Sequence, residues 1–476
     1  MTDDKYIWTL DMVLEATGGE LLATGGEQRF VGISTDSRTL RPGDLFIALK
    51  GENFDGHQFV EQAVSGGATG VIVALDETAK LAVQELQVSV FGVGDTLHAL
   101  GDLAGYWRRH HPVPVVAITG SNGKTTTKEM VAAIFSRSWK VLKNEGTFNN
   151  LVGLPLTLLQ LDDTHQGAVV ELGMNQPGEI QRLTEIVRPD VGLITNIQPA
   201  HLEGLGSLAG IQAAKGELFA GMAASATIVV NRDDPRVLDL ASSFPGRQVS
   251  FSAAGANGEV ALERILAIDA NGSRFLLKVA EESHEIYLPV IGRHHINNAV
   301  AAAAVARCLN LPVGTIAEAL ASFHPVDKRM EILVLSEDIH IINDTYNANP
   351  GSVAAALETL MKVKKKGRAF AVLGDMLEMG EDTATLHWQV GGIAAKEGVD
   401  HLLAMGAQAS HLLAGAAEAG MDSGCLTQAN DHQEMALRVR GLIAAGDWVL
   451  VKGSRGMRME KVVEQLVALS KNSEDP

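Results

Sequence analysis

The sequence predicts an α/β protein with three domains: a small N-terminal α/β domain, a central doubly wound domain with a phosphate loop (P-loop), and a C-terminal Rossmann-like domain. Its 476 residues suit about three domains, since one domain commonly holds about 100–200 residues. Short apolar runs alternate with amphipathic helical stretches, as in parallel sheets that helices cover on both faces. A Gly-rich turn separates one apolar run from the helix after it. We expect the domains to cover residues 1–94, 95–324 and 325–476.

The first region predicts a small sheet followed by a connecting helix. Val71–Ala74 and Val88–Val93 are apolar runs of strand length, and Phe59–Gly67 has the spacing of a short amphipathic helix. Thr96–His110 predicts the connecting helix. It should end before Pro112, because proline disfavours the helical conformation in the residue before it.

The second region alternates strands and helices. Its expected strands are Val113–Thr119, Ala168–Leu172, Val191–Thr195 and Ala226–Asn231. Its clearest helices are Lys124–Trp139, directly after the Gly-rich turn, and the Ala-rich Ile296–Cys308. This order predicts a mostly parallel sheet with both faces covered.

The third region repeats the alternation and predicts a second doubly wound sheet. Its expected strands are Ile339–Asn343, Ala369–Leu373, His401–Met405 and Trp448–Lys452. Its expected helices are Ser352–Val363, Thr385–Lys396 and Met459–Leu469.

Composition and charge exclude several classes of protein. An apolar content of 46% with 20% charged residues argues against disorder. The net charge of −18 disfavours a nucleic-acid partner, which clustered Lys and Arg would have to bind. Cys308 and Cys425 form no disulfide framework or zinc spacing, as expected in a reducing compartment. The acidic N-terminus lacks a signal-peptide layout and no apolar run reaches the ~20 residues of a membrane span, so we expect a cytoplasmic protein.

The strongest local signal is the segment TGSNGKTT between an expected strand and an expected helix. Gly120 and Gly123 allow a tight turn whose N–H groups point inward, and the helix N-terminus adds positive potential. Lys124 can reach the β- and γ-phosphates of a nucleotide, and the Thr125 hydroxyl can bind Mg²⁺. The expected nucleotide contacts from this loop are Gly120, Ser121, Asn122, Gly123, Lys124, Thr125 and Thr126.

The loop is a variant, because Ile118 stands where the usual P-loop signature has its first Gly. In this form it resembles the loop of the Mur ligase family and of its folylpolyglutamate synthetase relatives. Three N-terminal segments resemble the family's uridine-nucleotide domain: Thr35–Arg38, Gly43–Gly51 and Asp55–His57. Thr35, Asp36, Ser37 and Arg38 are therefore expected to bind the nucleotide-sugar substrate.

Two later segments, Asp344–Pro350 and Gly374–Gly380, resemble the branch of the family that uses D-alanyl-D-alanine. The resemblance implies an ATP- and Mg²⁺-dependent, ADP-forming ligase of peptidoglycan synthesis. It would join D-alanyl-D-alanine to the C-terminal carboxylate of a UDP-N-acetylmuramoyl-tripeptide through an acyl phosphate, and act as a monomer. The alternatives are a MurE-like or folylpolyglutamate synthetase-like ligase and a non-catalytic P-loop nucleotide-binding module. A GTPase-like switch would need an Asn/Thr-Lys-x-Asp motif, which the sequence lacks.

Candidates for the metal and acyl-transfer site lie outside the loop. Glu171 ends an expected strand, so it is either a metal ligand or an exposed carboxylate. Without the resemblance, His201 would be a structural or surface histidine, and Lys215, at the start of the turn Ala214–Glu217, a solvated helix lysine. The resemblance implies that Lys124, His201 and Lys215 are catalytic, and that Thr125, Glu171, His201 and Lys215 hold Mg²⁺. In the family the matching Lys takes up CO₂, so a carbamate on Lys215 is an open expectation.

The resemblance also implies further nucleotide contacts. Asn298 matches the second Asn of the family's adenine-contacting helix start, whereas His295 replaces the first. Arg329 matches a family Arg that contacts ATP, with Lys328 in place of the usual Gly before it. Asp344 is expected to orient the nucleotide.

The remaining expected contacts concern the two substrates to be joined. Asn149 and Asn150 lie in a segment similar to the family's UDP-sugar loop, although a plain turn would have the same composition. Asn347 and Asn349 suit a zwitterionic dipeptide, because carboxamides both donate and accept hydrogen bonds. Ser454 and Arg455 follow an expected strand and either face the dipeptide carboxylate or form only a turn.

Overall fold

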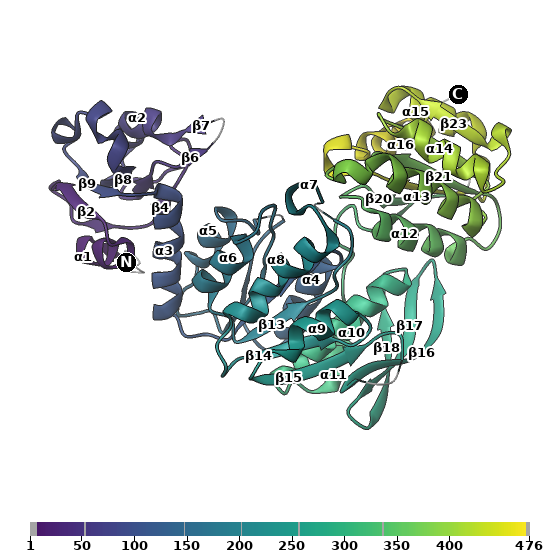
Figure 1. Cartoon of the computed structure of the whole chain (residues 1–476), viewed down its shortest axis with the longest axis horizontal. Helices are drawn as coiled ribbons and strands as arrows, with labels where there is room; N and C mark the ends of the chain where they lie inside the picture. The colour runs from purple at the N-terminus through teal and green to yellow at the C-terminus, as the bar shows by residue number, and fades with distance from the viewer. Residues whose placement is uncertain are drawn as a thin grey trace.

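Three larger β-sheets lie in an arc along the chain, with the N-terminal and C-terminal sheets at the two ends (Figure 1). Two separate strand pairs accompany them: β1 (Trp8–Thr9) with β3 (Arg29–Phe30), and β6 (Lys50–Gly51) with β7 (Phe54–Asp55). The computed structural model describes residues 7–51, 54–146, 148–200, 202–255, 258–335 and 338–472. This architecture confirms the predicted fold class of three α/β sheets with mostly parallel strands. No helix among these residues combines the length and the apolar character that a bilayer span needs.

The N-terminal sheet has five strands in the order β2-β9-β8-β5-β4. They are β2 (Glu20–Ala23), β4 (Ile33–Ser34), β5 (Leu45–Ile47), β8 (Gly70–Ala74) and β9 (Ser89–Val93). All pairs are parallel except β2 with β9. The helix expected over Phe59–Gly67 is divided. Phe59 belongs to a preceding 3-10 turn, Gly56–Phe59, in which the Asp55 side chain caps the His57 N–H. Helix α2 covers only Val60–Ser65.

The connecting helix α3 (Thr96–His110) has the predicted bounds, with Asp95 capping the His98 N–H. It packs on both sides. The Trp107 ring stacks on Trp8 of the N-terminal part at 4.9 Å, while its indole N–H donates to Leu161 O of the central part at 2.9 Å. The helix therefore joins the two sheets through its side chains as well as through the chain.

The central sheet has nine strands in the order β11-β12-β10-β13-β14-β15-β16-β17-β18. The strands are β10 (Val115–Thr119), β11 (Val141–Lys143), β12 (Gly167–Glu171), β13 (Val191–Ile194), β14 (Thr227–Asn231), β15 (Arg247–Ser252), β16 (Val260–Asp269), β17 (Gly272–Val279) and β18 (Glu282–Leu288). Pairing is parallel as far as β16, and β17 and β18 add two antiparallel strands, with β18 at the edge.

Helices cover both faces of this sheet, as its continuous apolar strands require. Along β10, Val115 and Ala117 face one core, whereas Val116 and Ile118 face the other. The first core is closed by α3, α5 (Gly153–Leu158), α6 (Glu179–Val187), α8 (Leu208–Gly221) and α9 (Pro235–Ser242). The second is closed by α4 (Lys124–Phe135), α10 (Arg293–Cys308) and α11 (Val313–Ala321).

One helix of this region is shorter than predicted. We expected Lys124–Trp139, but α4 ends at Phe135. The Trp139 N–H turns back to Phe135 O at 2.9 Å, and the two rings pack edge to face at 5.1 Å. The apolar Trp139 thus belongs to the turn that closes the helix.

The C-terminal sheet has six strands in the order β19-β20-β24-β21-β22-β23, all parallel except β19. The strands are β19 (Glu331–Leu335), β20 (Ile339–Asp344), β21 (Ala369–Gly374), β22 (His401–Met405), β23 (Leu426–Ala429) and β24 (Trp448–Lys452). One face carries α12 (Pro350–Val363), α13 (Thr383–Glu397) and α14 (Ala409–Glu418), and the other carries α15 (His432–Leu442) and α16 (Glu460–Asn472). All predicted elements of this region are present, with bounds shifted by up to three residues.

Candidate active site

A cavity of about 810 Å³ lies between the central and C-terminal sheets. Its walls come from the phosphate loop, the end of β12, the interior of α8, the start of α10 and the loops after β20, β21 and β24. It brings together most predicted site residues: Ser121, Asn122, Gly123, Lys124, Thr125, Thr126, Asn149, Asn150, Glu171, Lys215, Asn298, Arg329, Asp344, Asn347, Asn349, Ser454 and Arg455. The ends of parallel strands from two sheets therefore meet at one site.

Two glycines of the phosphate loop lie in close contact with neighbouring side chains. Gly120 has a φ of 144°, and a Cβ there would lie 1.9 Å from Thr195 Oγ1. Gly123 has a φ of 82°, and a Cβ there would lie 2.3 Å from Asn298 Oδ1. Both positions thus require glycine for the backbone conformation and for the space.

Lys124 begins α4 and folds back over its own loop. Its Nζ donates to Gly120 O at 2.8 Å and lies 3.4 Å from Ser121 O. Burial lowers the pKa of Lys124, the nearby Arg329 lowers it further, and the carboxylate of Glu171 opposes both. The ammonium group thus lies at the mouth of the loop, where a phosphate could exchange for the loop carbonyls.

Glu171 is a buried carboxylate at the end of β12, only 2% exposed, so the exposed alternative is wrong. Thr125 Oγ1 donates to Glu171 Oε2 at 2.6 Å, and Asn149 Nδ2 donates to Oε1 at 2.8 Å. Arg329 Nη2 donates to Thr125 Oγ1 at 3.0 Å. The strand end is fixed in turn by Asn144, whose Oδ1 accepts the Glu171 N–H at 2.9 Å, a contact that the sequence did not indicate.

Lys215 lies on a helix, inside α8, but it is 1% exposed, so the expectation of a solvated lysine is wrong. The apolar side of α8 packs on the sheet and carries this side chain inward. Among the described residues none forms a hydrogen bond or ion pair with its amine. Burial lowers the pKa of Lys215 well below its ordinary value, Lys124 lowers it further, and Glu171 acts in the opposite direction.

The donor set for a metal ion is partly described. His201, the expected histidine ligand, lies outside the described residues. Within the described ranges, no group of three or more His, Cys, Asp and Glu side chains could hold a metal ion. The oxygens that face the cavity are those of Glu171 and Thr125, and hard cations such as Mg²⁺ prefer oxygen ligands. These two residues fit such an ion, and an unmodified ammonium on Lys215 would oppose it.

The start of α10 and the chain segment near Arg329 form the wall beside the loop. The Arg329 guanidinium lies over the Tyr346 ring at 4.0 Å. Lys328 has a φ of 58°, in the left-handed region that favours glycine. Its Nζ pairs with Glu460 at 3.2 Å. His295 is buried, and neither of its ring nitrogens has a hydrogen-bond partner among the described residues.

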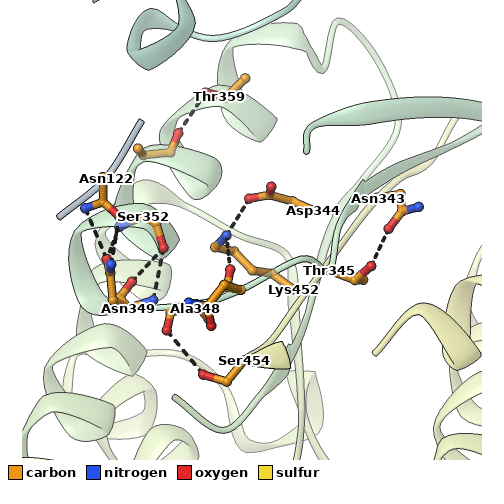
Figure 2. Close-up of polar contacts among 12 residues, drawn as sticks. Asn122, Asn343, Asp344, Thr345, Ala348, Asn349, Ser352, Thr359, Lys452 and Ser454 are labelled. Atoms are coloured by element: carbon orange, nitrogen blue, oxygen red, sulfur yellow. Dashed lines mark hydrogen bonds and ion pairs between the residues drawn. The ribbon is translucent and has the colours of Figure 1, made fainter. Parts of the chain in front are cut away.

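The C-terminal wall is a connected set of polar contacts (Figure 2). Lys452 Nζ donates to Asp344 Oδ2 at 2.6 Å and to Asn347 O at 2.8 Å. Ser454 Oγ donates to Ala348 O at 3.2 Å. We did not predict a role for Lys452. Its position at the end of β24, two residues before the expected Ser454, could have indicated from the sequence that Lys452 belongs to the site.

The segment Thr35–Arg38, expected from the sequence to bind the nucleotide-sugar, lies apart from the cavity, after β4 of the N-terminal sheet. Arg38 donates to both oxygens of Asp36 at 2.9 and 2.7 Å. These hydrogen bonds lower the pKa of Asp36 to about 2. Ser37 Oγ donates to Gln62 Oε1 at 3.3 Å. Thr35 completes the predicted segment, a polar turn in which Thr35, Asp36 and Ser37 are half-buried and Arg38 is exposed.

The similarity to known proteins extends over nearly the whole chain. Three family models match: "Mur ligase family, catalytic domain" over residues 29–108, "Mur ligase middle domain" over 118–306 and "Mur ligase, glutamate ligase domain" over 328–455. The UDP-N-acetylmuramoyl-tripeptide–D-alanyl-D-alanine ligase of Escherichia coli K12 is 38% identical, over 96% of this chain and 98% of that protein.

Solved structures agree with the sequence comparison. A crystal structure of MurF from Acinetobacter baumannii has a TM-score of 0.89 at 33% identity and covers 98% of this chain and 99% of that one. The MurF ligase of Thermotoga maritima in complex with ADP has a TM-score of 0.83 at 27% identity, covering 93% and 98%. From its three matched domains and its near-complete alignment with these enzymes, this chain belongs to the Mur ligase family.

Proposed function

We propose that this protein is an ATP-dependent, ADP-forming ligase that joins D-alanyl-D-alanine to a UDP-N-acetylmuramoyl-tripeptide in peptidoglycan synthesis. The observation that carries the proposal is the single cavity in which the phosphate loop faces the polar cluster of the C-terminal sheet. The relative from E. coli, which bears this activity in its name, aligns with 96% of the chain. The relative from T. maritima, solved with ADP, supports the nucleotide assignment.

The chemistry requires activation of a carboxylate, because its oxygen is a poor leaving group. Transfer of the γ-phosphoryl group of ATP to the tripeptide carboxylate gives an acyl phosphate and ADP. The dipeptide amine then attacks the carbonyl carbon, phosphate departs and a proton is lost. Lys124 is suited to neutralise charge on the transferring phosphoryl group, because it lies at the mouth of the loop.

Magnesium would supply positive charge at the phosphate oxygens. Thr125 and Glu171 would hold it, with His201 and Lys215 as the further expected ligands. A lysine cation beside a metal ion is repelled, whereas a carbamate has the opposite charge and offers oxygen ligands. A neutral Lys215 amine and CO₂ would give this carbamate with release of one proton. Its amine has no competing partner among the described residues.

The substrates are assigned to the three parts of the chain in order. Residues 1–94 would bind the uridine nucleotide through Thr35, Asp36, Ser37 and Arg38, residues 95–324 would bind ATP, and residues 325–476 would bind the dipeptide. Asn149 and Asn150 would contact the UDP-linked substrate. The nucleotide would also contact Asn298, Arg329 and Asp344. The dipeptide would lie against Asn347, Asn349, Ser454 and Arg455.

The test is phosphate release coupled to amide formation by the full chain, with each component omitted in turn. ATP, Mg²⁺, the UDP-linked tripeptide and D-alanyl-D-alanine together should give product, and each omission or excess EDTA should abolish it. Product with a single amino acid in place of the dipeptide would favour a MurE-like or folylpolyglutamate synthetase-like ligase. Nucleotide binding without product in any mixture would favour a non-catalytic module.

A further inference from the structure

The phosphate loop contacts the start of α12, on the C-terminal sheet, through a cluster of three carboxamides, those of Asn122, Gln198 and Asn349. Figure 2 shows Asn122 and Asn349. Asn349 Nδ2 donates to Asn122 Oδ1 at 2.7 Å, and Asn122 Nδ2 lies 3.3 Å from Asn349 Oδ1. Asn122 Nδ2 also donates to Gln198 Oε1 at 2.7 Å. Asn122 and Asn349 are 227 positions apart in the chain, so these bonds join separate parts of the fold.

Each end of this contact is fixed by further hydrogen bonds, on one side to residues that follow β13 and on the other to the first turn of α12. On the loop side, Asn122 O accepts from Thr195 Oγ1 at 2.6 Å, and Asn122 N–H donates to Asn196 Oδ1 at 3.0 Å. On the other side, Asn349 is the N-cap of α12, and its Oδ1 accepts the Ser352 N–H at 2.9 Å. Because both backbones are fixed, the two side chains have little freedom to find other partners.

The first turn of α12 is shaped to fit this cluster. Gly351 does not have a positive φ, so an alanine would suit the helix. A Cβ there would nevertheless lie 2.4 Å from Gln198 Oε1 and 3.5 Å from Asn122 Nδ2. Any larger residue must therefore displace the Gln198 carboxamide from its hydrogen bond with Asn122.

We propose that Asn122, Gln198 and Asn349 form an amide clasp that positions the C-terminal sheet against the phosphate loop and makes nucleotide affinity depend on the start of α12. In this role Asn349 and Gln198 are positioning residues. The inference rests on the proposed nucleotide site and adds a physical link to the dipeptide side, since Asn349 follows Asn347 and Ala348. Carboxamides carry no charge, so the contribution of the clasp to nucleotide affinity should be the same at all pH values from about 6 to about 9.

The experiment is calorimetric titration of the full-length chain with ADP in the presence of Mg²⁺. Asn349→Ser retains a good N-cap but is too short to reach Asn122. Two neutral hydrogen bonds are lost, each worth a few-fold to about tenfold, so ADP affinity should fall about tenfold. Asn122→Ala should cause a similar loss, and the double variant should be no weaker than the weaker single variant, within about twofold, if the two residues act through their contact.

A pair of glycine substitutions gives an independent and matched control. Gly351→Ala should weaken ADP binding several-fold, because its Cβ displaces Gln198. Gly441→Ala lies in α15, where a Cβ meets nothing within 4 Å. It should leave ADP affinity unchanged. Equal ADP affinity of Gly351→Ala and Gly441→Ala would overturn the clasp.

The other outcomes separate three explanations. No ADP binding by the unmodified chain would overturn the proposed function. Normal binding that Asn349→Ser does not alter, or losses that multiply in the double variant, would overturn the clasp alone. A lower melting temperature of Asn349→Ser with unchanged ADP affinity would reduce Asn349 to a structural N-cap and also overturn it.

Discussion

Replacing Glu171 by Gln tests the proposed metal site with little change of shape. In the folded protein the carboxylate accepts one hydrogen bond from Thr125 and one from Asn149. The Gln carbonyl can still accept from Asn149, but its NH₂ group would face Thr125 Oγ1, and the hydroxyl proton of Thr125 would lose its acceptor. One charge-assisted hydrogen bond is therefore lost, worth about 1.5–3 kcal/mol. Relief from burying the charge offsets part of this cost.

The fold should thus persist while the rate falls. Without an anionic oxygen from Glu171, we expect kcat to fall at least about 100-fold, which corresponds to a rise of ~2.7 kcal/mol in the activation barrier. We also expect the Mg²⁺ concentration that gives half the maximal rate to increase. The assay is phosphate release across a Mg²⁺ titration, with the melting temperature as the check on folding. Glu185→Gln is the control, because its carboxylate is exposed, pairs with Arg182 at 3.6 Å and accepts from Gln181 Nε2 at 3.1 Å, contacts of small energetic weight at a surface. A Glu171→Gln rate within tenfold, at unchanged Mg²⁺ dependence, would refute the reasoning.

Three further predictions follow from the same structure. Lys124→Ala should lower kcat by more than tenfold, above ~1.4 kcal/mol, with an unchanged circular dichroism spectrum; a smaller loss would contradict its role at the phosphate loop. Lys215→Ala should be nearly inactive and recover partly in formate or acetate, and full activity without added acid would rule out the carbamate. Burial alone would raise the pKa of Asp447, but hydrogen bonds from Arg368 and Ala444 have the larger effect and hold the pKa of this carboxyl below its ordinary value. Its stabilising contribution is therefore present above pH ~4 and lost as the pH falls through the lowered folded pKa, so the melting temperatures of the natural chain and Asp447→Asn should converge in acid; a constant gap from pH 7 to pH 3 would be inconsistent with this.

Most parallel strands of the central and C-terminal sheets were predictable because they are buried on both faces. The parallel strands β11, β15 and β23 were missed, because each contains exposed or half-buried residues. The runs around Val116 and Phe370 are continuously apolar, and the helices between them have clear spacing. The antiparallel strands β17 and β18 were missed. In both strands buried residues are interrupted by exposed or half-buried ones, so they lack the continuous apolar run by which we identified strands such as β10 and β21.

The site was predictable where one residue type implies one chemistry. The loop around Lys124 and the strand-end Glu171 meet at one cavity as expected. The environment of Lys215 was not predictable, because helix burial depends on which face meets the sheet. The contact of Asn122 with Asn349 could not be inferred either, since it depends on the relative position of two sheets that are distant in sequence.

The edge of the central sheet has a consequence for solubility. Strand β18 ends the nine-stranded sheet, so one row of its backbone groups has no neighbouring strand. Such rows can recruit strands from other molecules and lead to aggregation. The exposed positions of β18 are Glu282, Ser283, Glu285 and Tyr287, so two of the four are acidic, and a second copy pairing along this edge would bring like charges together. The acidic residues of this edge strand thus disfavour aggregation through β-pairing between molecules. Replacing these two acids by valine would create a surface prone to such pairing.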